Sequence, residues 1–321
     1  MAIPEWMAQI LTNEDAALCW QHIAAFALEQ ARQTTNPMTL HDDFVALDRV
    51  LSDAAWPLWE AFPSDAPHTV TALTRWWTQR GANRAVVILD GLSLRELPFL
   101  LDMLTQHGVT PLDVSATGAE VPTDTDHFAK ALGISGRSAL ANNHAPKGFA
   151  LTSSDCYTDV VILPFVDCIA DLPPRRDIVL WHTWPDDLFT THRLNTGHLQ
   201  RAIEQIFAEE GLWQLIAHLR QGRQVVITSD HGYATTNRFA SEEAGGVKDY
   251  LAGVFGAMRM ARSSELLKTA FLPPPALTFD GWHVVIGQRK WKMAGGFPHA
   301  CHGGLTILEA FSPFLIIPEA T

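Results

Sequence analysis

The 321-residue chain has few cysteines and few basic residues. Its cysteines are widely spaced and contain no CxxC pair; they are Cys19, Cys156, Cys168 and Cys301. In a chain of this length the spacing excludes a disulfide framework and a cysteine-based zinc motif, and a reducing, cytoplasmic compartment is expected. Lys and Arg number 23 against 35 Asp and Glu, which gives a formal net charge of −12. This acidic balance argues against strong non-specific binding to nucleic acids, because such binding depends on basic contacts to phosphates.

Long apolar runs are also missing. No stretch reaches the roughly 20 apolar residues that a membrane-spanning helix needs, and the first residues lack the basic start and apolar centre of a signal peptide. We therefore expect a soluble, cytoplasmic protein without membrane contact. Hydrophobic residues nevertheless make up 47% of the chain and charged residues only 18%, so a substantial core can form.

The hydrophobic pattern changes near residue 83. Residues 1–82 are predicted to be helical, because apolar residues between Phe44 and Leu58 recur at spacings of three and four; Pro57 is expected to end or kink that helix. Beyond this segment, apolar runs such as AVVILD, DVVILP, DIVLWH and QVVIT alternate with helical stretches. This alternation is typical of an α/β fold with a mostly parallel sheet flanked by helices. Residues 83–321 are thus predicted to form an α/β domain behind a helical N-terminal segment.

Two apolar segments near the C-terminus, WHVVIG and KWKMA, are expected to pair as strands, and PFLIIP is expected to form a last strand. The run Gln288–Lys292 interleaves basic and aromatic residues. It either grips a nucleotide phosphate and stacks a base or is a solvated strand face.

Polar residues follow the predicted strands, and in open α/β sheets function gathers at the carboxyl ends of strands. The residues expected at or near this edge are Asp90, His182, Asp186, Asp187, Asp230, His231 and His302. Asp and His side chains suit zinc or manganese, and several of them together would repel one another unless cations neutralised them. Two ions roughly 3.5–4 Å apart can activate a nucleophile and stabilise a leaving oxygen. This pattern predicts a two-metal site suited to the cleavage of phosphate esters.

Each motif also has a purely structural interpretation. Asp90-Gly91 can be a plain turn, and His302 with its two glycines can be a loop before a helix. Thr125, in VPTDTDHFAKAL, stands where a helix cap would stand. The order of the motifs along the chain is what favours a functional site.

In that order the motifs resemble the alkaline phosphatase superfamily: Asp-Gly after an apolar strand, then Pro-Thr-x-Thr, Ser-Asp-His-Gly and His-Gly-Gly-Leu. Within it, DGLSLRELP, SDHGYATT and CHGGLTILEAFSPFLII are most similar to the PglZ family, over roughly residues 85–318. The resemblance implies an alkaline-phosphatase-like fold and a two-metal phosphohydrolase or phosphodiesterase. It also implies an association with BREX-type bacteriophage defence.

The resemblance carries residue roles with it. Asp90, Asp230 and His231 resemble the ligands of one metal ion. Thr125 matches the nucleophile, which would bind the same ion and so be activated for attack on phosphorus. His302 matches a ligand of the second ion.

The remaining ligands of the second ion are less regular. The segment HTWPDDLFTTHRL offers Asp186 or Asp187 together with His192, at spacings of six and five residues where the superfamily pattern has four. His198 is a further candidate. Whether this second site is complete stays open at this point.

A threonine nucleophile is shared with the nucleotide pyrophosphatase and phosphodiesterase branch, so nucleotide-type phosphodiesters are the expected substrates and two zinc ions, or manganese, the expected cofactors. Thr123, two residues before Thr125, is expected to tolerate alanine far better. The alternative is a catalytically weak PglZ-type scaffold whose N-terminal helices bind partners in a defence complex. An intact set of Asp90, Thr125 and His302 favours the enzyme, and the irregular segment 186–192 favours the scaffold.

Overall fold

The computed structural model describes residues 5–34, 36, 39–170, 172–174, 176–192, 196–243, 245–262 and 271–320, with the backbone alone at 11, 190–192 and 196. Five helices follow one another in the N-terminal part: α1 (Glu5–Thr12), α2 (Ala16–Gln33), α3 (Leu40–Asp53), α4 (Pro57–Asp65) and α5 (Thr69–Arg80). One detail of the prediction is wrong, because no single helix runs from Phe44 to Leu58. Helix α3 ends at Asp53, and Pro57 opens α4, where its missing N–H costs nothing.

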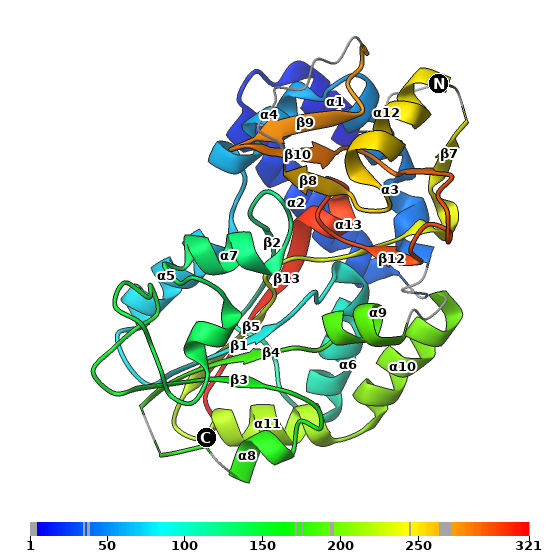
Figure 1. Cartoon of the computed structure of the whole chain (residues 1–321). Helices are drawn as coiled ribbons and strands as arrows, with labels where there is room; N and C mark the ends of the chain where they lie inside the picture. Colours follow the sequence, from blue (N-terminus) through cyan, green and yellow to red (C-terminus); the bar gives the residue numbers. More distant parts are fainter. Residues whose placement is uncertain are drawn as a thin grey trace.

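A six-stranded sheet lies at the centre of the molecule, in the order β2-β13-β5-β1-β4-β3 (Figure 1). Its strands are β1 (Arg84–Leu89), β2 (Asp113–Gly118), β3 (Cys156–Val161), β4 (Asp177–His182), β5 (Gln224–Thr228) and β13 (Phe311–Ile317). Strand β1 pairs in parallel with β4 and β5, and β3 pairs in parallel with β4; β13 runs antiparallel to both β5 and β2. The predicted mostly parallel sheet is confirmed.

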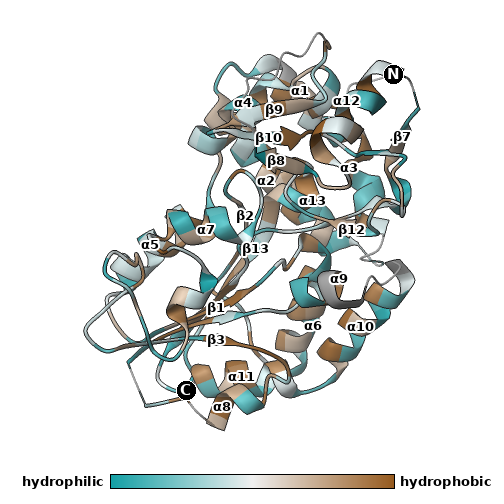
Figure 2. Cartoon of the chain, viewed as in Figure 1, coloured by the Kyte–Doolittle hydropathy of each residue, from teal (hydrophilic) through white to brown (hydrophobic). Residues whose placement is uncertain are grey.

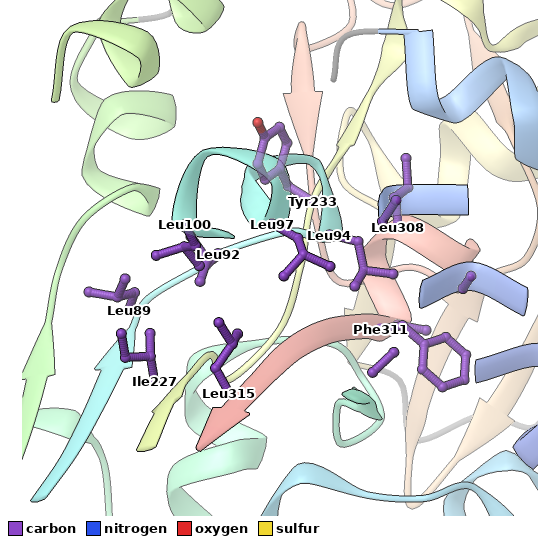
Figure 3. Close-up of a cluster of buried hydrophobic side chains, with 14 of the residues drawn as sticks. Leu89, Leu92, Leu94, Leu97, Leu100, Ile227, Tyr233, Leu308, Phe311 and Leu315 are labelled. Atoms are coloured by element: carbon purple, nitrogen blue, oxygen red, sulfur yellow. The ribbon is translucent and has the colours of Figure 1, made fainter. Parts of the chain in front are cut away.

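Helices cover both faces of this sheet. The later ones are α6 (Leu97–Gln106), α7 (Thr125–Ala131), α8 (Asp167–Ala170), α9 (Asp186–His192), α10 (Thr196–Ala208), α11 (Gly211–Leu219), α12 (Gly245–Phe255) and α13 (Ile307–Ala310). Successive strand residues point to opposite faces. Val87 and Leu89 therefore join a large buried cluster with α2, α6 and α11, part of which Figure 3 shows, whereas Val86 and Ile88 face a second cluster with α5 and α7. In Figure 2 the helices α10 and α11 accordingly carry both hydrophobic and hydrophilic residues.

Three small sheets complete the described part of the fold. Strand β10 (Trp282–Val285) lies between β8 (Met260–Arg262) and β9 (Ala276–Phe279); β11 (Arg289–Trp291) pairs with β7 (Ala240–Glu242), and β12 (Ala300–Cys301) pairs with β6 (Ala234–Thr235). The predicted pairing of WHVVIG with KWKMA is therefore wrong. Both segments contain a strand, but each strand pairs with a different partner.

The N-terminal helices and the sheet share one buried cluster. The ring centroid of Trp20 in α2 lies 6.0 Å from that of Phe311 in β13, and Phe62 in α4 meets the same ring edge-on at 5.7 Å. The division into a helical segment and an α/β domain near residue 82 stays a prediction. No helix in the described part of the chain is both long and apolar enough to cross a membrane.

Asp48 connects helix α3 to the C-terminal part of the chain. Its Oδ1 accepts a hydrogen bond from the Ile307 N–H at 2.9 Å, and its Oδ2 accepts one from the Gln288 amide at 2.7 Å. The side chain is 1% exposed, and burial raises its pKa from 3.8 to about 7. Because the folded state holds the proton more tightly than the unfolded state, this carboxyl contributes stability below about pH 4 that is lost as the pH rises through 7.

The Asp48→Asn variant should remove this pH dependence, since an amide keeps hydrogen-bonding atoms at the same positions but does not titrate. Between pH 5 and pH 8 the free energy of unfolding of the wild type should fall by roughly 2–3 kcal/mol more than that of the variant. Urea unfolding at the two pH values measures this difference. Asp102→Asn, at an exposed position of α6, is the control, and equal pH dependence in the wild type and Asp48→Asn would refute the role of Asp48.

Candidate active site

The carboxyl ends of β1 and β5 bring Asp90, Asp230 and His231 together. All three side chains are fully buried, and one ligand atom of each lies within 4.8 Å of the others. The His231 Nε2 atom lies 3.7 Å from Asp90 Oδ1 and 3.6 Å from Asp230 Oδ2. This nitrogen is buried and has no hydrogen-bond partner among the described residues. Two buried carboxylates around an unpaired imidazole nitrogen fit a divalent cation.

Main-chain hydrogen bonds orient these ligands. Asp230 Oδ1 accepts the N–H groups of Gly91 at 2.9 Å and His231 at 3.0 Å. The Nδ1–H of His231 donates to the Gly232 carbonyl at 2.9 Å, so its Nε2 faces the carboxylates. Such outer hydrogen bonds are typical of metal-binding histidines, whose ring orientation they fix.

The hydroxyl of Thr125 belongs to the same group. Its Oγ1 lies 2.9 Å from Asp230 Oδ2 and 3.2 Å from Asp90 Oδ1, and the residue is half-buried. The capping interpretation of Thr125 is wrong. The cap of α7 is Asp124, whose Oδ1 accepts from the His127 N–H at 2.8 Å, and Thr125 is the first residue of the helix.

A second group contains Asp186, His302 and again His231. Asp186 begins α9, where its N–H donates to the Asp90 carbonyl at 3.0 Å. The Nδ1–H of His302 donates to the Thr123 carbonyl at 3.3 Å, and its Nε2 lies 3.7 Å from Asp186 Oδ1. The rings of His231 and His302 stack with centroids 4.4 Å apart. The two groups of candidate ligands are therefore adjacent.

Asp187 lies in neither of these groups. Its Oδ2 accepts from the Thr183 hydroxyl at 3.3 Å, within the turn that begins α9. Of the two neighbouring carboxylates, Asp186 is the one that lies beside His302.

The three other candidate histidines, His182, His192 and His198, differ in where the structure places them. The side chain of His192 lies outside the described residues, so its part in the site stays a prediction. His198, on α10, is exposed and lies in neither group. His182 is buried, its Nδ1 accepts from the Trp184 N–H at 3.0 Å, and burial lowers its pKa to about 3. His182 is therefore a neutral residue of the interior.

Thr123 supports the loop that carries His302. Its hydroxyl donates to the Gly304 carbonyl and accepts from the Gly303 N–H, both at 2.9 Å, and the side chain is fully buried. Loss of this hydroxyl would leave two buried polar groups without their partner. From these contacts we expect Thr123→Ala to be more harmful than the sequence pattern predicts.

Close packing explains why the second residue after His302, Gly304, is a glycine. A Cβ at Gly304 would lie 2.4 Å from the Nε atom of Arg259. Arg259 forms a fully buried ion pair with Glu309 at 2.8 Å, and the same Glu309 oxygen accepts from the Gly304 N–H at 3.1 Å. The motif thus reflects the close approach of the backbone to a buried charge pair next to His302.

The carboxylates give the site a negative field that favours a positive charge at its centre. Burial disfavours a charge on His231, but the carboxylates of Asp230 and Asp186 outweigh burial and raise its pKa. Burial, together with the neighbouring His231, lowers the pKa of His302. Metal ligands must be deprotonated, so metal binding here should weaken in acid.

Sequence reasoning missed Arg137. This residue begins the short helix η3 (Arg137–Leu140), and its guanidinium pairs with Asp90 Oδ2. A cation bound at Asp90 would compete with the guanidinium for the same carboxylate. The Arg137→Ala variant should therefore bind zinc or manganese severalfold more tightly, as measured by competition with a fluorescent chelator. Lys147→Ala, an exposed basic residue, is the control, and weaker metal binding by Arg137→Ala would contradict the competition.

The structure contradicts base stacking by the run 288–292, whereas Lys292 is exposed and its contact with a phosphate stays a prediction. Trp291 is only 2% exposed and its Nε1–H donates to the Gly256 carbonyl at 2.7 Å, so its ring is not available to stack on a base. Lys290 donates to the Thr236 carbonyl at 2.9 Å, and Arg289 pairs with Glu242 at 2.9 Å. The run holds the small strands together.

No family model matches the chain, and no curated protein sequence matches it. The solved structures that resemble it include inactive murine ectonucleotide pyrophosphatase/phosphodiesterase 5 in complex with AMP, at a TM-score of 0.44 and 13% identity, over 74% of this chain and 88% of that chain. A second structure of the murine protein has a TM-score of 0.41 at 13% identity, and one of the human protein has 0.40 at 11%, with the same coverage. The likeness concerns the path of the chain and assigns no role to any residue.

Proposed function

We propose that the chain is a metal-dependent phosphohydrolase of the alkaline phosphatase type that cleaves nucleotide-type phosphodiesters. The position of the Thr125 hydroxyl carries this proposal. It lies between two buried carboxylates, 2.9 Å from Asp230 and 3.2 Å from Asp90, on a half-buried residue. A serine or threonine hydroxyl becomes a nucleophile when a neighbouring group stabilises its alkoxide.

Two ions would be held by the two adjacent groups. Asp90, Asp230 and His231 would hold one ion with Thr125; Asp186 and His302 would hold the other, with His192 as the proposed further ligand. When bound, the ions supply positive charge for the alkoxide and for the leaving oxygen. Carboxylate oxygens and imidazole nitrogens suit zinc, with manganese as the alternative.

The protein groups around Thr125 would position it for attack. Asp124 caps α7 and so fixes the first turn from which the hydroxyl projects. Thr123, in the same segment, holds the loop of His302. Attack by Thr125 would form a covalent intermediate in which phosphorus is bonded to the threonine oxygen and still carries one ester group, and the other ester group would leave as an alcohol with the proton of the Thr125 hydroxyl. Water would then cleave the Thr–O–P bond, which restores Thr125 and releases the phosphate monoester.

Metal analysis and an activity assay on the same sample test the proposal. Two zinc or manganese ions per chain are expected, together with cleavage of bis(4-nitrophenyl) phosphate that a chelator abolishes and added metal restores. A chain that binds no metal and cleaves no diester would refute it.

The PglZ-like motifs extend the proposal to a cytoplasmic role in phage defence. The competing candidate is a scaffold with little activity, favoured by the six-residue spacing of Asp186 and His192. A chain that binds a single ion, cleaves diesters very slowly and co-purifies with defence proteins would favour the scaffold.

A further inference from the structure

A cavity of about 600 Å³ lies between the start of α9 and the segment 294–300. Most of the side chains that line it are apolar, and its lining residues are Leu188, Phe189, Leu199, Ala257, Ala294, Gly295, Gly296, Phe297, Pro298, His299 and Ala300. A volume of roughly 300–1,000 Å³ is typical of sites for small organic ligands.

Phe189 connects this cavity to the candidate metal ligands. A Cβ built on Gly91, the residue after Asp90, would meet Phe189 Cε2 at 3.6 Å, Asp186 Cβ at 3.4 Å and His231 Cε1 at 3.6 Å. The edge of the Phe189 ring therefore lies beside ligands of both groups. Ala300, another lining residue, is in β12, two residues before His302, and Figure 1 shows β12 near α9. Phe189 is thus both a lining residue of the cavity and a neighbour of the candidate ligands.

The lining of the cavity selects an uncharged, flat group. Among the described residues that line it, His299 alone is ionisable, and none is a Lys or Arg that could hold a polyanionic backbone. Phe189 and Phe297 offer aromatic surfaces, and aromatic rings prefer offset or edge-to-face partners. Gly295 and Gly296 leave room, since a Cβ at either would have nothing within 4 Å.

We propose that this cavity binds an aromatic ring carried by the phosphodiester, either a nucleobase or a simple aryl group, while the phosphoryl group lies at the ligands around Asp90 and His302. The inference rests on the proposed function and narrows its substrates to small diesters with an aromatic group next to the phosphate. Burial of an aromatic ring contributes roughly 25 cal/mol of binding free energy per Å² of apolar surface removed from water. A methyl ester buries much less apolar surface, so it should bind much more weakly than an aryl or nucleoside ester.

Binding of two phosphonates to the zinc-loaded protein tests the cavity without any turnover. Phenylphosphonate should bind at least tenfold more tightly than methylphosphonate in isothermal titration calorimetry. Ala294→Trp fills the cavity from an exposed position, and should reduce this ratio to below about threefold at unchanged zinc content. Ala257→Trp fills it from the segment that follows α12 and should have the same effect. Ala25→Trp, at an exposed position of α2, is the matched control and should keep the ratio.

Further ligands and outcomes separate the alternatives. AMP that binds more tightly than phenylphosphonate assigns the cavity to a nucleobase, and the reverse order assigns it to an aryl group. Equal binding of the phenyl and methyl compounds, or a ratio that Ala294→Trp and Ala257→Trp leave unchanged, overturns the cavity proposal. If diesters are cleaved regardless of their organic group, the cavity proposal fails while the function stands. If the aromatic preference holds but no diester is cleaved, the function fails while the cavity stands.

Discussion

Thr125→Ala should reduce cleavage of bis(4-nitrophenyl) phosphate by at least about a thousandfold while the protein stays folded and keeps its metal. Removal of a nucleophile abolishes the covalent step, and such losses in other hydrolases reach several orders of magnitude. Stability should change little, because Asp124 and not Thr125 caps the helix. Alanine also has a higher helix propensity than threonine.

The comparison needs a matched set of variants. Thr125→Ser should retain part of the activity, because the hydroxyl survives and only the methyl group is lost. Thr110→Ala, at an exposed threonine between α6 and β2, is the control and should behave as the wild type. Rates are compared at saturating metal, so that weaker metal binding is not mistaken for lost chemistry.

Thr123→Ala should give a different signature from Thr125→Ala. Its hydroxyl contacts both Gly303 and Gly304, so its loss should displace His302 and lower metal content and stability together with activity. If Thr125→Ala is as active as the wild type, Thr125 is not the nucleophile, and the scaffold interpretation is then favoured.

The strands β1, β4 and β5 could be predicted because each is a short apolar run that is followed by polar or turn residues. β1, β4 and β5 are buried along almost their whole length, and strands buried on both faces have continuous apolar sequences. Strand β2 had no such signal. It lies at the edge of the sheet, its first half is partly exposed, and its sequence DVSATG contains few apolar residues.

Strand pairing beyond the central sheet could not be read from the sequence. The strands β10 and β11 are close in sequence, but β11 pairs with β7, about fifty residues earlier. Such pairing is decided by tertiary contacts, among them the buried Arg259, which donates to the carbonyls of Gly287 and Arg289. The hydrophobic pattern of the sequence around these strands does not predict those contacts.

Candidate ligands could be predicted where the parallel sheet determines their position. Asp90 and Asp230 each follow a parallel strand, so they had to meet at one edge. The choice between Asp186 and Asp187 depended on how a turn aims two consecutive side chains, which the sequence does not encode. Arg137, Thr123 and Phe189 were missed because each acts through a contact with residues far away in the chain.

Asp186→Ala should remove one of the two bound ions and reduce diester cleavage by at least about a hundredfold, whereas Asp187→Ala should keep both ions. The two residues are chemically identical neighbours in the first turn of α9, which makes them a matched pair. Only Asp186 lies with His231 and His302, its Oδ1 3.7 Å from the His302 Nε2.

The expected loss follows from charge as well as geometry. Without the carboxylate of Asp186, the described part of the second group consists of two stacked imidazoles, and neutral nitrogen ligands alone offset little of the charge of a divalent ion. Zinc per chain, measured by mass spectrometry after dialysis, should fall from two to one in Asp186→Ala. The remaining ion should stay with Asp90 and Asp230, beside Thr125. The nucleophile would therefore keep the metal ion that activates it, but the leaving oxygen would lose the metal ion that stabilises its negative charge. Loss of an ion in Asp187→Ala but not in Asp186→Ala would reverse the assignment, and two ions in both variants would remove this segment from the metal site.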